Sequence, residues 1–179
     1  MVGSGGIGGV VVSSIDEHVR GLGGEVVALT TNPEIAAVVR EHGFRLTGVD
    51  GARTVRAAII TELDANTAPF DQILLATQPP QVEDAARNAL PWLAPDGVMV
   101  CFQNGLCEDR IARIAGAERV LGAVVAWGAT MPEPGVYERT AAGGFTIGRI
   151  DGRDDPRVER LALTLEAVGP ITQIGRAHV

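Results

Sequence analysis

Apolar residues occur along this chain in short runs that alternate with longer stretches of helical spacing. Residues 7–22 repeat apolar side chains at the spacing of one helical face, and Gly23 with Gly24 ends that helix. A short apolar strand follows over 26–29. Asn32 and Pro33 then open a second helix, because Asn caps a helix and Pro fits its first turn; this helix runs to about residue 42.

The later pattern repeats this alternation. Residues 73–76 and 98–102 are apolar on both faces, as expected for central strands of a parallel sheet. The other predicted elements are a hairpin over 44–60 around residues 49–51, a helix over 79–93, a helix over 106–115, a strand over 120–126, two antiparallel strands over 135–149 and a helix over 156–168. Strands alternating with helices predict an α/β fold with a Rossmann-type, doubly wound, mostly parallel sheet.

Composition narrows the class of protein. Apolar residues make up 46% of the chain and aromatic residues only 4%, so small aliphatic side chains must build the core, as in layered α/β proteins. The formal charge is −7 and no basic cluster occurs, which argues against a nucleic-acid partner. No apolar run approaches the ~20 residues of a membrane span, and the opening stretch lacks the cationic start of a signal peptide. We therefore expect a soluble cytoplasmic protein without a membrane partner.

The two cysteines are too few for a disulfide framework and favour a reducing compartment. Cys101 lies in an apolar run and is interpreted as a core residue. Cys107 opens a predicted helix, where a thiol pKa can be lowered, but no His lies near it in sequence, so packing is favoured over nucleophilic chemistry. We predict no metal site.

A glycine-rich motif, G-x-G-x-x-G, opens the chain at Gly3, Gly5 and Gly8. Gly3 permits the tight turn, Gly5 lets a pyrophosphate approach the backbone, and Gly8 lets the helix pack on the strand. Free N–H groups at the helix start bind the anion, so the predicted cofactor-binding loop comprises Gly3, Ser4, Gly5, Gly6, Ile7 and Gly8. A purely structural turn is the alternative, although the following helix and strand favour binding.

Only Met1 and Val2 precede this motif, whereas a buried first strand usually has ~5–6 residues. We therefore expect the sequence to begin within its own first strand.

The residues after the second predicted strand bear on the choice of cofactor. An NAD enzyme usually carries an acid there to hold the ribose 2′-hydroxyl, but this chain has Thr30, Thr31 and Asn32. These residues can donate hydrogen bonds to a 2′-phosphate, and no acid repels it, so the sequence favours NADP(H). Asn32 also has a simpler interpretation as a helix cap, and the two roles are compatible.

A family resemblance covers nearly the whole chain. Residues 97–148 combine a strand ending in Asn104-Gly105, a helix, the run Glu118-Arg119-Val120-Leu121-Gly122 and a Pro134-Gly135-Val136 hairpin. Together with the glycine motif, this combination resembles ketopantoate reductases (2-dehydropantoate 2-reductases), which implies their N-terminal NADP-binding domain.

The resemblance assigns roles to particular residues. Thr31 falls where many members carry an Arg for the 2′-phosphate, and Gln78 falls where many carry a cofactor-contacting Lys. Gln81 matches a Gln one turn further on, and Ala129 matches a backbone contact to the cofactor. Asn104 matches an Asn beside the nicotinamide ribose and the substrate, in a supporting catalytic role. It also follows a buried strand at the edge where α/β ligands bind, although a helix cap is the simpler alternative.

In this family a Lys of a helical second domain donates the proton and a Glu binds the substrate. This chain contains no Lys at all. We expect residues 1–173 to be the dinucleotide-binding domain, without the helical domain, and therefore inactive alone. Residues 174–179 can be encoded by the codons of a widely used sequencing adapter, so we expect them to be foreign to the gene.

The resemblance implies NADPH-dependent reduction of 2-dehydropantoate to pantoate in pantothenate and coenzyme A biosynthesis, with a homodimer as one form of the full-length parent. Two alternatives remain. One is a reductase of another 2-oxo acid or ketone, and the other is a non-catalytic NADP-sensing module. Gln78 in place of the family's Lys slightly favours both alternatives.

Overall fold

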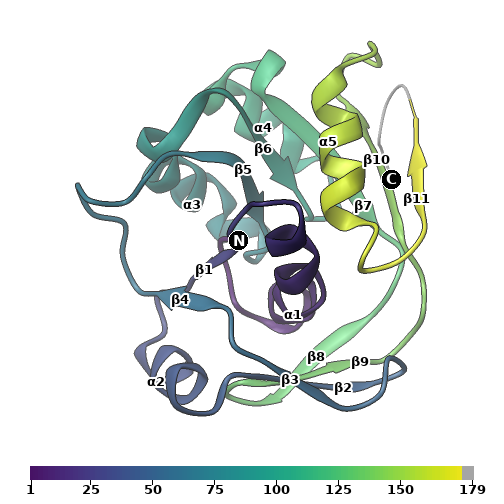
Figure 1. The fold of residues 1–179 in the computed structure, drawn as a ribbon. Helices are drawn as coiled ribbons and strands as arrows, with labels where there is room; N and C mark the ends of the chain where they lie inside the picture. The colour runs from purple at the N-terminus through teal and green to yellow at the C-terminus, as the bar shows by residue number, and fades with distance from the viewer. Residues whose placement is uncertain (175–179) are drawn as a thin grey trace.

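The computed structural model describes residues 1–174, and a mixed, mostly parallel sheet forms its centre (Figure 1). Its larger part has the order β11-β10-β7-β6-β5, and a smaller part pairs β1 with β4 in parallel. The strands are β1 (Val27–Leu29), β4 (Ala58–Ile60), β5 (Phe70–Leu75), β6 (Leu93–Cys101), β7 (Val120–Val125), β10 (Phe145–Arg149) and β11 (Ile171–Gln173).

Residues 1–3 join the two parts into one sheet. Val2 forms parallel bridges to Leu29 on one side and to Leu75 on the other. The amine of Met1 donates to the Val27 carbonyl oxygen at 2.8 Å. The strand order is therefore β4, β1, residues 1–3, β5, β6, β7, β10 and β11, with only β10 and β11 reversed. This arrangement confirms the predicted Rossmann-type sheet.

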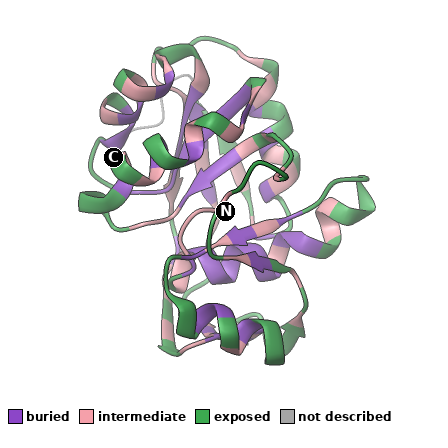
Figure 2. Ribbon diagram, turned by 90° about the vertical axis from the view of Figure 1, so that its left-hand side faces the viewer, coloured by how far each residue is buried: buried purple, intermediate pink, exposed green. Residues whose placement is uncertain are grey.

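Helices cover both faces of the sheet, as the doubly wound prediction requires. α1 (Gly6–Gly21) and α5 (Pro156–Leu165) pack on one face against side chains that include Leu74 and Val100. α3 (Val82–Ala89) and α4 (Cys107–Ala115) pack on the other face against Leu75, Met99 and Cys101. Figure 2 shows the resulting pattern of buried strands beneath helices that expose only their outer side. Successive residues of β5 and β6 thus enter opposite cores, which explains their uninterrupted apolar sequence.

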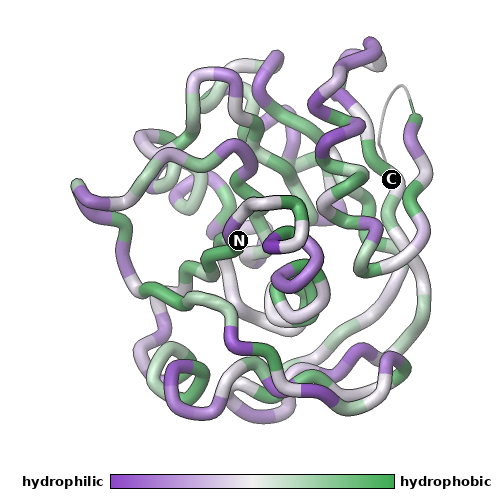
Figure 3. Tube along the Cα trace, in the orientation of Figure 1, coloured by the Kyte–Doolittle hydropathy of each residue, from purple (hydrophilic) through white to green (hydrophobic). Residues whose placement is uncertain are grey.

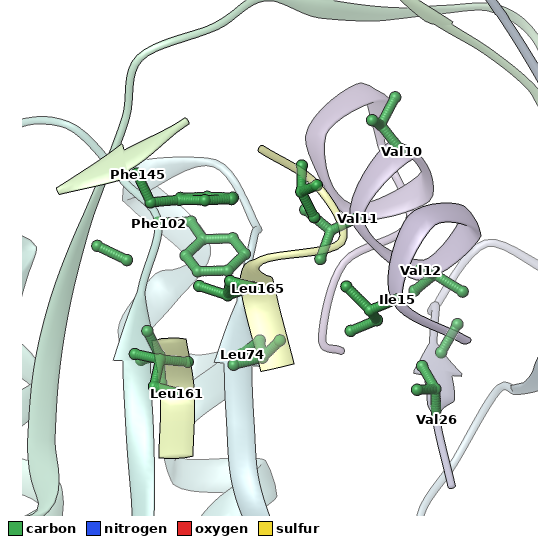
Figure 4. Packing of buried hydrophobic residues seen from close by; sticks show 14 of the residues in the cluster. Val10, Val11, Val12, Ile15, Val26, Leu74, Phe102, Phe145, Leu161 and Leu165 are labelled. Carbon is green, nitrogen blue, oxygen red and sulfur yellow. The ribbon is translucent and has the colours of Figure 1, made fainter. Parts of the chain in front are cut away.

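Aliphatic side chains of α1 and α5 meet aromatic rings from the strand ends in the larger core (Figure 4). The rings of Phe102 and Phe145 lie 5.3 Å apart, and Trp127 meets Phe145 edge-on at 5.8 Å. Hydropathy along the chain follows this burial, because the apolar segments lie inside and the polar ones on the outer turns (Figure 3).

A second, four-stranded sheet with the order β3-β2-β9-β8 lies beside α1. Its strands are β2 (Phe44–Gly48), β3 (Arg53–Val55), β8 (Ala129–Glu133) and β9 (Val136–Arg139), and α2 (Pro33–His42) precedes it in the chain. The predicted hairpin is correct for β2 and β3, but residues 58–60 leave it as β4 and pair with β1. Local alternation cannot distinguish a neighbouring strand from a distant parallel one.

The prediction of two strands within residues 135–149 is confirmed by β9 and β10, but the prediction that they form an antiparallel pair was wrong. β9 pairs with β8 and with β2, whereas β10 pairs with β7 and β11 in the central sheet. The chain changes sheets at Gly143 and Gly144, where a Cβ atom would collide with the backbone of Ala126 and of Pro170 respectively. β8 and β11 were not predicted.

Helix ends follow the sequence signals more closely. The Oδ1 atom of Asn32 accepts hydrogen bonds from the N–H groups of Glu34 and Ile35, and α2 ends at Gly43 as predicted. The long helix predicted over 79–93 is instead three pieces: a 3-10 turn at Pro79–Gln81, α3, and a 3-10 turn at Leu90–Trp92. Pro91 explains the break, because it lacks the N–H that an α-helix needs at that point.

Candidate functional site

The glycine-rich loop runs from the first strand into α1. Each of its three motif positions favours glycine for a different physical reason. Gly3 has a φ of +96°, and a Cβ atom there would lie 2.9 Å from the Ala76 carbonyl carbon. A Cβ atom on Gly8 would overlap the Gly3 carbonyl oxygen, so Gly8 is needed where helix and strand touch. Gly5 differs from both, because its φ is −78° and a Cβ atom would meet nothing within 4 Å. The fold therefore needs glycine at residues 3 and 8, whereas no contact within the described residues requires glycine at residue 5, which is the position where a Rossmann-type loop leaves room for a pyrophosphate.

The start of α1 is suited to an anion. Gly5 is its N-cap and offers no side-chain hydrogen bond to the first N–H groups. Among the five α-helices of residues 1–174, α1 is the one without an acidic residue in its first turn. Its unpaired N–H groups and the positive end of its dipole are therefore free of a competing carboxylate.

Buried polar atoms without partners mark the same edge of the sheet. Residues 1–3, β5, β6 and β7 run parallel, and such an atom belongs to the first residue after residues 1–3 and to the second residue after β5, β6 and β7. Within the described residues these atoms have no hydrogen-bond partner: Ser4 Oγ, Thr77 Oγ1, Gln103 Oε1 and Trp127 Nε1. Leaving a polar group buried and unpaired costs about 1–3 kcal/mol each. Ligands of open α/β sheets bind at this carboxyl edge, so this row fits a polar ligand.

A groove lies at this edge and gathers most of the predicted cofactor residues. Gly3, Ser4 and Gly5 form its glycine wall, Thr30 and Thr31 lie at the end of β1, and Gln78 and Gln81 lie after β5. The remaining lining comes from Val2, Leu29, Ile35, Ala76, Thr77, Asp84, Ala85 and Asn88. Among residues 1–174, none that lines the groove is a cation, so the polar groups that these residues can offer a phosphate are neutral donors.

Thr30, Thr31 and Asn32, which follow β1, make different contacts. Thr30 is buried, and its Oγ1 accepts the Asn32 N–H at 3.3 Å. Thr31 is exposed beside the groove. The Asn32 side-chain oxygen caps α2, so only its amide N–H groups are left as donors toward a ligand. The predicted role of Asn32 as the cap of α2 is thus confirmed, and its free amide N–H groups are compatible with the predicted role in cofactor binding.

Other predicted residues lie near the groove without lining it. Gly6, Ile7 and Gly8 begin α1 behind the loop, and Ile7 packs against the larger core. A Cβ atom on Gly6 would lie 2.8 Å from the Ala129 carbonyl oxygen, so the backbone of Ala129 directly adjoins the loop. Asn104 is exposed three residues beyond β6 and is not the cap of α4, whose N-cap is Leu106 without a side-chain hydrogen bond.

Sequence reasoning missed several residues of this site. Thr77 and Gln103 follow β5 and β6, and the Gln103 amide N–H groups donate to the carbonyl oxygens of Leu75 at 3.1 Å and Thr77 at 3.0 Å. Their position just after a buried strand was the available signal, the same one that pointed to Asn104. Tyr137 had no such signal; its hydroxyl donates to the Ser4 carbonyl oxygen at 3.4 Å, and burial raises its pKa to about 12.

The cysteines show no sign of nucleophilic chemistry. Burial raises the pKa of Cys101 well above its usual value, and burial also raises that of Cys107 despite the neighbouring Arg110. Residues 1–174 contain no group of three or more His, Cys, Asp or Glu side chains that could hold a metal ion. In the same part of the chain, no helix is both long and apolar enough to cross a membrane.

These features together fit a dinucleotide. The space at Gly5, the acid-free start of α1 and the unpaired polar atoms among residues 1–174 are typical of Rossmann-type domains that bind a dinucleotide. Residues 1–152 match the model of the family described as ketopantoate reductase PanE/ApbA, so the chain belongs to this family.

Individual relatives agree with this assignment. The 2-dehydropantoate 2-reductase of Halobacterium salinarum is 31% identical over 156 residues, which are 85% of this chain and 51% of the relative. The chain therefore spans about half the length of the curated relative it matches.

Two solved structures share the fold. The 2-dehydropantoate 2-reductase of Porphyromonas gingivalis W83 is 20% identical with a TM-score of 0.84, over 96% of this chain and 62% of the other. A D-mandelate dehydrogenase solved with NADH and anilino(oxo)acetate is 20% identical with a TM-score of 0.79, over 97% of this chain and 56% of the other.

Proposed function

We propose that this chain is the cofactor-binding part of a reductase that uses NADPH to convert 2-dehydropantoate to pantoate. The observation that carries the proposal is the groove at the carboxyl edge of the sheet, with Gly5 open toward it and Ser4 Oγ and Thr77 Oγ1 buried without partners. Membership of the ketopantoate reductase family supports the reaction. We place the reaction in the cytoplasm, within pantothenate and coenzyme A biosynthesis, and in a homodimer of the full-length enzyme.

Each part of the groove has a task in binding. The bound nicotinamide supplies the hydride. The N–H groups at the start of α1 hold the pyrophosphate, while Tyr137 fixes the loop from behind through the Ser4 carbonyl oxygen. Thr31, the Asn32 amide and Gln78 donate to a 2′-phosphate, and the backbone of Ala129 supports the loop at Gly6. Asn104 lies beyond β6, where it can hold a ribose or substrate oxygen.

The preference for NADPH rests on what is absent from the end of β1. Residues 30–32, directly after β1, include no acid, and the one acid among the described residues that line the groove is Asp84, an exposed carboxylate paired with Arg87 at 3.2 Å. Since the donors are neutral, we expect a moderate preference, with NADPH binding about fivefold more tightly than NADH, and a weak dependence on salt. Isothermal titration calorimetry with both cofactors tests this. Tighter binding of NADH would overturn the NADP assignment.

We find no suitable proton donor for ketone reduction in this sequence. Reduction of a ketone needs a proton for the forming alkoxide, and general acid catalysis contributes typically ~10²–10⁴-fold. The sequence contains no Lys, and the amide of Asn104 is not an acid of suitable pKa. We therefore expect the purified 179-residue chain to bind NADPH but not to oxidise it with 2-dehydropantoate. Absorbance at 340 nm measures this, with the full-length Halobacterium salinarum relative as positive control. Turnover at a rate similar to that control would show that an acid other than Lys lies within these residues.

A reductase of another 2-oxo acid is the second candidate. The fold similarity to a D-mandelate dehydrogenase, solved with NADH and an oxo acid, is the observation that favours it. A non-catalytic NADP sensor is the third, supported only by Gln78 in place of a Lys. Binding of NADPH without turnover in any longer version of the protein would favour the sensor.

A further inference from the structure

Gln103 is a buried side chain that the proposed function does not yet use. It follows β6 by two residues, and only 7% of its surface is exposed. Both N–H groups of its amide are engaged, with the carbonyl oxygens of Leu75 at 3.1 Å and Thr77 at 3.0 Å. The side chain therefore ties the end of β6 to the end of β5.

These two bonds fix the orientation of the amide. A carbonyl oxygen can only accept, so the group that faces Leu75 and Thr77 must be the NH₂ end. A flipped amide would place its oxygen against two other oxygens. The Oε1 atom consequently points away from β5, and it is buried with no hydrogen-bond donor in the described part of the chain. An acceptor held in this way needs a donor from outside the protein or from water.

The position of Gln103 identifies the part of a ligand that supplies this donor. The glycine loop and the end of β1, which form the groove, lie on one side of β5, and Gln103 lies on the other side, over β6. A dinucleotide that starts over β1 and crosses the glycine loop places its other half over β6. That half is the nicotinamide riboside, whose ribose hydroxyls and carboxamide N–H groups are neutral donors.

We propose that Gln103 recognises the nicotinamide half of the cofactor, with Oε1 accepting a hydrogen bond from a hydroxyl or N–H group of the nicotinamide riboside. This inference rests on the proposed function. Gln103 would then bind the nicotinamide half of the cofactor through Oε1. The NH₂ group of the same side chain positions Thr77, and with it the start of the segment that carries Gln78.

The test compares two ligands. NADPH carries both halves of the dinucleotide, whereas 2′,5′-ADP lacks the nicotinamide riboside. Gln103→Met removes the polar atoms at nearly constant size, and we expect it to weaken NADPH binding about tenfold while 2′,5′-ADP binding changes less than twofold. Equal weakening of both ligands would show that Gln103 only ties the strands together, and unchanged binding of NADPH would remove the contact altogether.

Gln72 provides a matched control. It also lies on the central sheet with a buried, unpaired Oε1 atom, but near the start of β5 and outside the groove. Gln72→Met should therefore leave both affinities unchanged. A tenfold loss of NADPH affinity in this variant as well would show that the effect is not specific to the carboxyl edge, and would contradict the proposal.

A second measurement uses the unmodified chain, so it decides the question even where Gln103→Met does not fold. The side-chain amide resonances of Gln103 in ¹⁵N–¹H spectra should shift when NADPH is added and stay in place when 2′,5′-ADP is added. Resonances that NADPH does not move, or that both ligands move alike, contradict the proposal. If the unmodified chain binds neither ligand, the proposed function itself fails, which is a different outcome from an NADPH complex that ignores Gln103.

Discussion

A substitution at Gly5 should change cofactor binding without changing the stability of the fold. The backbone angles of Gly5, φ −78° and ψ −166°, are open to any residue, and a Cβ atom would meet nothing within 4 Å. Replacing Gly by Ala restricts the unfolded chain, which stabilises by about 0.4–1 kcal/mol. Ala is a poorer N-cap than Gly, and this loss of about 0.5–1 kcal/mol offsets the gain. We therefore expect Gly5→Ala to keep the free energy of unfolding within about 1 kcal/mol of the original, a change in Tm of no more than ~4 °C.

The effect on binding should be far larger. The methyl group would occupy the space where the pyrophosphate approaches the loop, and overfilling a packed site costs about 1–3 kcal/mol. This corresponds to a loss of NADPH affinity between about 5-fold and 150-fold. The larger side chain of Gly5→Val would fill more of this space, and we expect it to abolish NADPH binding in a chain that still folds.

Gly8→Ala serves as the contrasting variant, because a Cβ atom there would overlap the Gly3 carbonyl oxygen. It should lose the fold itself. Circular dichroism with thermal unfolding and calorimetric titration with NADPH separate the two variants. If Gly5→Ala is folded and binds NADPH as tightly as the original, Gly5 does not face the phosphates and the assignment of the groove is wrong.

Two further predictions concern stability. Burial lowers the pKa of the Met1 amine from 8.0 to about 5, so the unfolded chain binds more protons than the folded chain between these pH values. The free energy of unfolding should therefore fall by up to about 4 kcal/mol as the pH drops from 8 to 5, and urea unfolding across this range measures the change. If a chain acetylated at Met1 shows the same dependence on pH, the amine is not its origin. Arg139→Met should cost about 1–3 kcal/mol in urea unfolding, because the buried guanidinium donates to the carbonyl oxygens of Val168 at 2.8 Å and Gly143 at 2.6 Å, which lose this donor, while the exposed Asp50 at 2.9 Å returns to water. An unchanged free energy of unfolding would show that these contacts are not coupled to folding.

The sequence predicted the central architecture because its signals there are local. Residues 73–75 and 98–101 are apolar without interruption since each strand faces two cores, and Asn32 and Gly43 mark the ends of α2 through cap chemistry. Gly3 and Gly8 were likewise correctly placed at a tight turn and a close helix contact.

The errors arose where structure depends on distant partners. Nothing in residues 135–149 alone says that β9 joins β2 and β10 joins β7, because the choice is made by strands tens of residues away. Gln103 was missed for a related reason. Its amide is oriented by the carbonyl groups of Leu75, at the end of β5, and of Thr77, just beyond it, and no pattern within the segment of Gln103 reveals these partners.

If the groove binds the cofactor as proposed, we expect its specificity to come from geometry more than from charge. None of the described residues that line the groove is a cation, and the protein carries a formal charge of −7, so we expect no long-range attraction for a phosphate-bearing ligand from these residues. What remains is short-range: the acid-free N-terminus of α1 and a row of unpaired polar atoms at one edge of the sheet. Such groups are strong only where water is excluded and orientation is fixed. On the proposed function we therefore expect Tyr137, bonded to Ser4, and Gln103, bonded to Leu75 and Thr77, to contribute to cofactor binding, because their hydrogen bonds fix the backbone of the groove.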